Sequence, residues 1–309
     1  MWGLPISGDM RPSYARISQT ESRLSHNTHR TSGGTVSHST VANDKVAHVA
    51  NNFAKDRFIL LQLVTKDFKL RYRRSILGVV WSVLNPLLMM IVMSFVFSYF
   101  LRGSSVANYP LYLIVGNITF SLMNEATSTG LRSIIDAAPL LKKVKVDRWV
   151  FPVQKVFSAA FNFAFSLIAV VIVMLFFQIA PTWHLVWMIP ALALLMVFCM
   201  GISMLIGALA VFFRDMIHLW SVLLTAWTYL TPIFWDLSLL TASNAPWIVT
   251  AVVKANPMYN YIDMMRCAIV YQASPGTTVI LLSIFWAIVA LIAGLLVFRK
   301  TEHKFILFI

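Results

Sequence analysis

The chain contains a long stretch, from Val156 to Phe213, without a single Asp, Glu, Lys or Arg. A helix that crosses a bilayer needs about 20 mostly apolar residues, because it rises about 1.5 Å per residue through roughly 30 Å of hydrocarbon. The stretch is long enough for two such helices, and the residues from Pro181 to His184 supply a turn between them. We therefore expect this part of the chain to cross a membrane twice.

The composition extends this expectation to most of the chain. Of its 309 residues 59% are hydrophobic and 12% are charged, whereas soluble domains are about 45–50% apolar and about 25% charged. We predict an all-α membrane domain over residues 75–309 with six transmembrane helices. The predicted spans are 78–101, 109–131, 149–177, 185–213, 216–234 and 277–298.

The distribution of basic residues predicts the orientation. The net charge is +13, but the Lys and Arg residues lie at the edges of the predicted spans and form no basic groove of the kind that binds nucleic acid. If the N-terminus is inside, all but three of the 25 basic residues are cytoplasmic, and only Arg102, Lys254 and Arg266 are outside. Cytoplasmic loops carry the excess of Lys and Arg, so we expect both termini on the cytoplasmic side of the inner membrane.

Two segments before the first span have different characters. Residues 1–52 are rich in Ser, Thr, His and Arg and lack the apolar core of a signal peptide, so we expect a disordered cytoplasmic tail. Residues 53–74 alternate apolar and basic residues at helical spacing. This pattern predicts an amphipathic helix in the cytoplasmic interface, although a plain juxtamembrane anchor has the same composition.

The segment 236–276 fits neither a solvated loop nor a span. It is apolar, but Pro246, Pro257 and Pro275 interrupt it before any full crossing. Asn256 and Pro257 are typical of a helix start, and Asp263 and Arg266 have the spacing of a pair on one helical face. We predict a re-entrant helical hairpin on the outer side, which serves as a gate.

The sequence contains no arrangement typical of a catalytic or metal site. It has no phosphate-binding GxxxxGK[ST] loop, and Cys199 and Cys267, its only cysteines, have apolar surroundings. We therefore expect no enzyme activity, no metal and no cofactor in this chain. If it moves cargo uphill, a partner must supply the energy.

Several short motifs, taken in order, resemble those of a known family. They are Ser75-Ile76-Leu77-Gly78 with Trp81, Leu84 and Pro86; Leu140-Leu141-Lys142-Lys143-Val144 with Arg148 and Phe151-Pro152; Phe213-Arg214-Asp215; Thr231-Pro232-Ile233-Phe234; and Asn256-Pro257-Met258-Tyr259. This series resembles the ABC-2 type permeases of polysaccharide export from about Lys66 onward. The long polar tail and Pro139 depart from the family pattern.

The resemblance implies a homodimer of six-span subunits, with two copies of a nucleotide-binding subunit that hold ATP and Mg. It also implies a coupling loop at 131–148 seated on that ATPase. The segment from Leu131 to Leu141 mixes apolar and charged residues and is short enough for a docking helix. The candidate coupling residues are Leu131, Ile134, Ile135, Leu140, Leu141, Lys142 and Lys143; a simple connector that obeys the positive-inside rule remains the alternative.

The candidate cargo contacts are basic, aromatic and acidic. Arg71, Arg73 and Arg74 lie at the foot of the first span, where a lipid phosphate would arrive. A carboxylate such as that of Glu125 is costly at membrane depth, so Glu125 is a functional candidate. The alternative is that Glu125, near the cytoplasmic end of its predicted span, snorkels to the interface or caps a helix. The candidate path residues are Trp220, Trp227, Tyr229, Trp235, Asn256, Pro257 and Tyr259; an interfacial aromatic belt would give the same composition.

These observations favour export of a lipid-linked polysaccharide, of the O-antigen, galactan or teichoic-acid class. The expected partners are the ATPase, a second copy of the chain, a polyprenyl-linked glycan and the membrane. A drug or small-lipid exporter of the same superfamily is the main alternative. A membrane enzyme that acts on polyprenyl carriers is a remote one, because it would need acidic or His clusters at a membrane face.

Overall fold

The computed structural model describes residues 58–70, 78–100, 108–142, 146–237, 239 and 246–308. The chain divides into two compact units, Met1–Asn52 and Phe53–Ile309, and only the second contains described residues. The predicted tail, the head-group candidates Arg71, Arg73 and Arg74, and the coupling candidate Lys143 therefore lie outside the described residues.

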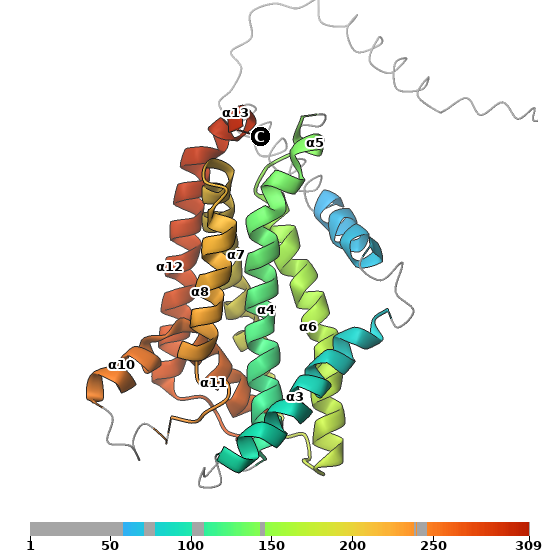
Figure 1. The fold of residues 1–309 in the computed structure, drawn as a ribbon, viewed down its shortest axis with the longest axis vertical. Helices are drawn as coiled ribbons and strands as arrows, with labels where there is room; N and C mark the ends of the chain where they lie inside the picture. Colours follow the sequence, from blue (N-terminus) through green and yellow to red (C-terminus); the bar gives the residue numbers. More distant parts are fainter. Residues whose placement is uncertain are drawn as a thin grey trace, which may run out of the picture. The chain divides into compact units, whose positions relative to one another are not determined.

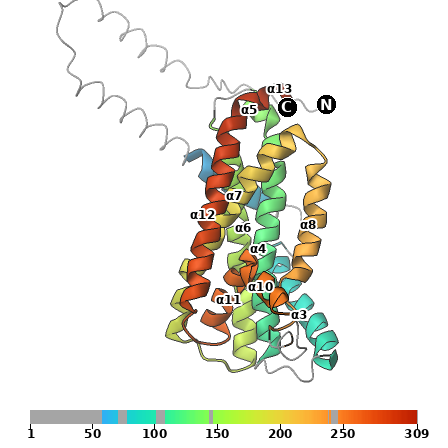
Figure 2. The same cartoon turned by 90° about the vertical axis from the view of Figure 1, so that its left-hand side faces the viewer.

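Every regular element in the described part of the second unit is a helix (Figure 1). The long helices are α3 (Val80–Phe100), α4 (Tyr109–Asp136), α6 (Val150–Phe176), α7 (Met188–Phe212), α8 (Met216–Leu230) and α12 (Thr277–Thr301). The short ones are α5 (Ala138–Leu141), η2 (Trp183–Trp187), α10 (Trp247–Ala255), α11 (Pro257–Ile269), η3 (Glu302–Lys304) and α13 (Phe305–Phe308). Figures 1 and 2 show α5 and α13 at one end of the long helices and α10 and α11 at the other.

Four segments are long and apolar enough to cross a membrane: Val80–Phe97, Val150–Phe176, Trp183–Phe212 and Thr277–Lys304. The prediction of an all-α, multi-pass membrane protein is thereby confirmed. The helices α4 and α8 fall outside these limits for different reasons. With 28 residues α4 is long enough, but it carries many polar side chains, whereas α8 is apolar but has only 15 residues.

Helix α4 is the centre of the packing. It contacts α3, α6, α7, α8 and α11, and its side chains from Leu111 to Val115 are almost completely buried. The closest helix pair is α7 and α12, which cross at Gly201 and Gly294. A Cβ atom on Gly294 would collide with the backbone of Gly201, and one on Gly201 with the backbone of Ala290. The absence of side chains at the two glycines is what allows this crossing.

Helix ends agree with the sequence where local chemistry determines them. Asn256 is the N-cap of α11, and its side chain accepts a hydrogen bond from the Met258 amide, as predicted. The end of α4 differs from expectation. Residues 131–136 continue α4 instead of forming a separate docking helix, because Leu131 and Ile134 lie on its buried face. Only the four residues of α5 remain as an independent turn.

Candidate translocation and coupling sites

A polar face runs along α4. Asn117, Ser121, Glu125 and Ser128 recur every three or four residues, and Asn124 lies next to Glu125, so the five share one side of the helix. Ser121 and Asn124 are exposed and the other three are half-buried. Polar groups at membrane depth are costly against lipid. This face therefore requires water, protein or a polar cargo beside it.

A polar cavity of about 130 Å³ lies beside this face, between α3, α4 and α6. The Asn162 amide donates to Glu125 Oε2 at 2.7 Å, and the Ser82 hydroxyl donates to Asn162 Oδ1 at 2.9 Å. Asn162 thus joins all three helices, and the space is sufficient for several water molecules. The polar residues that line the cavity are Ser82, Asn85, Asn117, Ser121, Glu125, Asn162 and Ser166.

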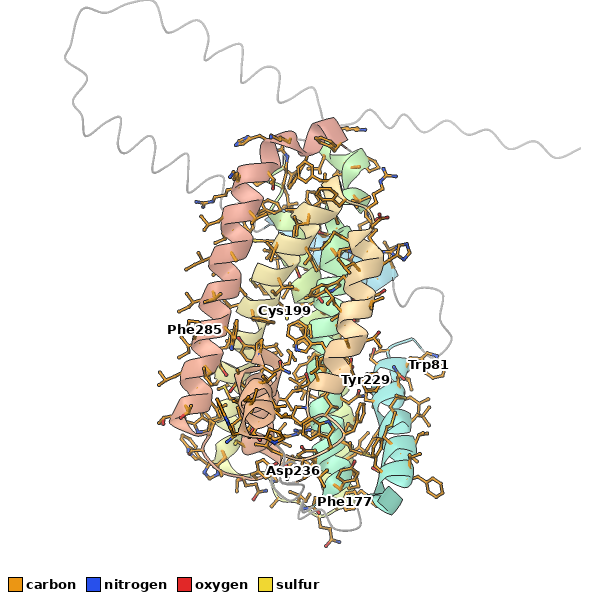
Figure 3. All side chains as sticks on the ribbon, turned by 60° about the vertical axis from the view of Figure 1, so that its left-hand side comes forward. Trp81, Phe177, Cys199, Tyr229, Asp236 and Phe285 are labelled. Atoms are coloured by element: carbon orange, nitrogen blue, oxygen red, sulfur yellow. The ribbon has the colours of Figure 1, made fainter. Side chains whose placement is uncertain are left out.

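The aromatic candidates on α8 divide between its two sides. Trp220 is 8% exposed and donates from Nε1 to Thr127 Oγ1 at 3.2 Å. Trp227 packs edge-on against Trp220, so both rings are engaged within the subunit. Tyr229 is instead 72% exposed and projects from α8 on the side that faces α3 in Figure 3. Trp235, beyond the helix, is half-buried.

The exposed polar residues of α8 were not predicted. His218, Ser221 and Thr225 are exposed and spaced at three and four residues, which places them on one face. The same spacing is present in the sequence, but the aromatic residues of this segment gave the stronger signal and were chosen as the path candidates. Helices α4 and α8, in contact with each other, therefore both present polar faces.

Asn256 links the start of α11 to the end of α8. Its Oδ1 atom accepts from Trp227 Nε1 at 2.8 Å, and its Nδ2 atom donates to Thr231 Oγ1 at 3.0 Å. Pro257 is the first residue of α11, and Tyr259, two residues later in the same turn, is half-buried. Asn256 and Pro257 thus have a clear role in positioning the hairpin.

Arg266 completes this attachment from the other end of α11. It is 2% exposed. Its Nη1 atom donates to the Pro232 carbonyl at 2.8 Å and its Nη2 atom to the Ile233 carbonyl at 3.0 Å. Its guanidinium also lies 3.4 Å from the centre of the Tyr112 ring, a close cation–π contact. The guanidinium donates to these carbonyls, and Asp263, three residues earlier on α11, is close enough to attract it electrostatically, as the spacing predicted.

The coupling candidates, at the end of the bundle that contains α5, divide into buried and exposed residues. Leu131 and Ile134 are 2% and 0% exposed, so they pack inside the subunit. Ile135 and Leu141 are half-buried, whereas Leu140 and Lys142 are exposed. Of these described candidates, only Leu140 and Lys142 are exposed enough to contact a partner directly.

The described part of the amphipathic helix, residues 58–70, lies against α6. The Asp67 carboxylate contacts both Gln154 and Lys155, and the Phe68 ring stacks on Phe165 at 5.7 Å. Phe58, Leu61 and Leu70 are more than half exposed. A helix held along one side with exposed apolar residues on another suits a membrane interface.

Comparison with known proteins decides the family. Residues 60–270, more than half of the chain, match the ABC-2 type transporter family. The chain belongs to the ABC-2 type transporters. The match starts in the helix at 58–70 and ends just after α11, so it includes residues 131–148 and the helices α10 and α11.

Two curated relatives align over most of their length with this ABC-2 transporter. The O-antigen export system permease protein RfbA of Myxococcus xanthus is 28% identical over 249 residues, which cover 81% of this chain and 94% of the relative. An RfbA of Klebsiella pneumoniae with the same description is also 28% identical, over 80% and 93%. The resemblance drawn from the motifs is thereby confirmed, and both relatives are described as permease proteins.

Proposed function

We propose that this chain is the permease subunit of an exporter that moves a lipid-linked polysaccharide across the inner membrane. The cargo would be a glycan of the O-antigen, galactan or teichoic-acid class. The observation that carries the proposal is the alignment with O-antigen export permeases over more than nine-tenths of their length. The polar faces of α4 and α8 support it, because a glycan chain needs hydrogen-bonding groups throughout its passage.

In this proposal α3, α4, α6, α7, α8 and α12 each cross the membrane. At 28 residues α4 is about 42 Å long, and its polar face is directed to the path rather than to lipid. The 9 residues of α10 and 13 of α11 are too few to span roughly 30 Å. They form a re-entrant hairpin over 236–276 that gates the outer end. The charge distribution supports cytoplasmic termini.

Energy comes from two copies of a separate nucleotide-binding subunit, which hold ATP and Mg. The coupling loop, residues 131–148, contacts this ATPase through Leu140, Lys142 and Lys143. Leu131, Ile134, Ile135 and Leu141 support the loop from below, as their burial indicates. This division revises the expectation that all seven residues share one docking surface.

The translocation path forms between two copies of the chain. Its lining comprises the polar faces of α4 and α8 together with Tyr229 and Trp235. Trp220 and Trp227 hold α8 in place, and Asn256, Pro257 and Tyr259 shape the outer end. At the cytoplasmic entrance Arg71, Arg73 and Arg74 bind the phosphates of the carrier lipid, which suits the bidentate guanidinium group.

Reconstitution tests the proposal directly. The chain and its ATPase partner are placed in proteoliposomes with an undecaprenyl- or decaprenyl-diphosphate-linked oligosaccharide. We expect the glycan lipid to stimulate ATP hydrolysis and to become accessible on the opposite face. Stimulation by hydrophobic drugs and not by the glycan lipid would favour the drug exporter.

Replacing Asn124, which is exposed on the polar face of α4, with Leu should reduce glycan transport more than Leu296→Ala on the exposed side of α12.

A further inference from the structure

The chain does not continue straight beyond α12. After Thr301 it turns through η3 and α13, and we call this segment, Glu302–Phe308, the hook. Phe305 is completely buried. Its ring lies edge-on 5.4 Å from the ring of Phe298 and is tilted against that of Phe212 at 6.1 Å. The Phe308 ring packs edge-on against Phe212 at 5.0 Å. The hook is therefore packed onto α7 and α12 by aromatic contacts.

The apolar cluster around Phe305 also holds both flanks of the coupling loop. Ile134, at the end of α4, and Val153, at the start of α6, are buried members of this cluster. Leu141 of α5 and Trp149 pack against it as partly buried neighbours. The loop thus leaves the bundle and returns to it on the same cluster as the hook. Figure 1 shows α5 and α13 near each other at this end.

A hydrogen bond joins the loop to the hook directly. Arg148 Nη1, at the end of the loop, donates to the carbonyl of Glu302 at 2.7 Å. Glu302 is the first residue of the hook, so its carbonyl is bonded to a side chain from 154 residues earlier in the chain. A charge-assisted bond of this type is stronger than one between neutral groups.

The loop has little means to maintain its own geometry. Helix α5 has four residues and none of them is buried, and such a short helix is unstable in isolation because helix nucleation is unfavourable. Its position must come from tertiary contacts. Among these, Leu141 packs on the cluster between the exposed Leu140 and Lys142, and Arg148, at the far end of the loop, is bonded to Glu302.

We propose that the hook is a positioning element for the coupling loop. By holding Leu141 and Arg148 it keeps α5 rigid against α7 and α12, so that a displacement imposed by the ATPase moves these helices instead of bending the loop. The inference rests on the proposed function in one respect, namely that the loop receives the ATPase. The contacts between hook and loop lie within this chain and do not depend on the ATPase.

The first experiment measures that link without the partner. Amide hydrogen exchange is followed in the purified chain for Phe305→Ala, for the milder Phe305→Leu and for His303→Ala, an exposed hook residue that serves as control. We expect exchange in residues 137–149 to rise at least about tenfold in Phe305→Ala and less in Phe305→Leu. The control and the amides of α7 and α12 should remain unchanged. Unchanged loop exchange in both Phe305 variants would overturn the inference, as would uniform acceleration across α7 and α12, which would indicate a purely structural role.

The second experiment measures coupling in the assembled transporter. For Phe305→Leu we expect ATPase binding and basal hydrolysis close to wild type, with the amount of cargo moved per ATP reduced severalfold. A lower protein yield with an unchanged transport-to-ATP ratio would contradict the inference. If loop exchange rises but no ATPase binds even the wild-type chain, the proposed function fails while the hook's positioning role stands.

Discussion

Arg266 and Asn256 hold the break that follows α8. The last carbonyls of a helix lack partners within that helix. The carbonyls of Pro232 and Ile233, which follow this break, accept from Arg266, while Thr231 Oγ1 accepts from Asn256. Arg266 belongs to α11 and Asn256 is its N-cap, so α11 and the end of α8 are stabilised together. A change in one is expected to displace the other.

Replacing Arg266 tests this dependence. Arg266→Met removes the guanidinium donors to the buried carbonyls of Pro232 and Ile233. The Pro232 carbonyl keeps a long contact from the Tyr112 hydroxyl at 3.4 Å, whereas the Ile233 carbonyl loses its donor, and an unsatisfied buried group costs about 1–3 kcal/mol. We expect a marked loss of thermal stability in detergent for Arg266→Met. The loss for Arg266→Lys should be smaller, because an ammonium still donates hydrogen bonds, although it cannot reproduce the planar fork of the guanidinium. Arg214→Met, at an exposed arginine, is the control. Equal melting temperatures for Arg266→Met and wild type would refute the proposed attachment.

Two glycines provide a matched pair of substitutions. A Cβ atom on Gly116 would lie 2.6 Å from Arg266 Nη2, whereas one on Gly276 would meet nothing within 4 Å. Gly116→Ala should therefore push the guanidinium out of place and destabilise the protein by about 1–3 kcal/mol. Gly276→Ala should change stability by less than about 0.5 kcal/mol. Thermal unfolding of both purified variants makes the comparison, and similar losses in the two would argue against steric displacement.

A third residue test concerns the ATPase contact. Leu140 is 37% exposed and Leu296 is 65% exposed, so Leu→Ala at either position should have little effect on folding. Only Leu140→Ala should weaken binding of the ATPase, by about tenfold if Leu140 fills a pocket at the interface. Binding of the purified ATPase to each variant in nanodiscs can be measured by surface plasmon resonance. Undiminished affinity for Leu140→Ala would remove α5 from the interface.

The residue expectations succeeded where a local rule was sufficient. Asn256 was recognised as a cap because Asn followed by Pro is determined by the backbone of the helix start itself. The burial of Leu131 and Ile134 was not predictable in the same way. An apolar pair at this spacing marks one helix face, but the sequence does not indicate whether that face meets α7 or an ATPase. The partners of Arg266 lie 34 and 33 residues away, beyond any local pattern.

At the level of elements, apolar length predicted the helices better than their ends. Each predicted span corresponds to a helix of the structure, because hydropathy over about 20 residues is a strong signal. The α4–α5 boundary was missed because residues 131–136 have both apolar and charged members, which suit a helix end and a loop equally. The polar face of α4 was partly overlooked as well. Its spacing is regular, but neutral polar residues in a span are a weaker signal than a charged residue, so only Glu125 was predicted as a candidate.

The α7–α12 crossing gives an element-scale prediction. Because the backbones meet at Gly201 and Gly294, Gly294→Ala must force the helices apart and should cost at least about 1–3 kcal/mol. Ile292→Ala, at a residue 52% exposed on the same helix, should have a much smaller effect. Thermal unfolding of both variants in the same detergent would show the difference. If Ile292→Ala were the more damaging of the two, the close crossing would not be a main determinant of stability.

For the whole molecule, the two ends of the bundle are held together by different kinds of contact. At one end the hook, the coupling loop and Leu60 of the helix at 58–70 share an apolar cluster. At the other end α10 and α11 are attached to α8 and α4 through Asn256 and Arg266. Helices α4 and α7 extend between these ends and contact each other closely. A displacement at the coupling loop therefore has a continuous packed route to the hairpin.

The proposed orientation of these ends can be tested by labelling single cysteines. Cys199 and Cys267 are first replaced by Ala and Ser, and a cysteine is then introduced at Lys254 or Ser274 near the hairpin, or at Lys142 or His303 at the opposite end. All four positions are exposed, so access depends on the side of the membrane and not on burial. An impermeant thiol reagent added to intact cells should label the first two and reach the other two only after permeabilisation. Because α10 and α11 are too short to cross roughly 30 Å, the hairpin must return to the side on which it began, and α12 must then carry Arg299 and Lys300 inward. Labelling of Lys254→Cys and His303→Cys from the same side would rule out this arrangement and the six-span topology with it.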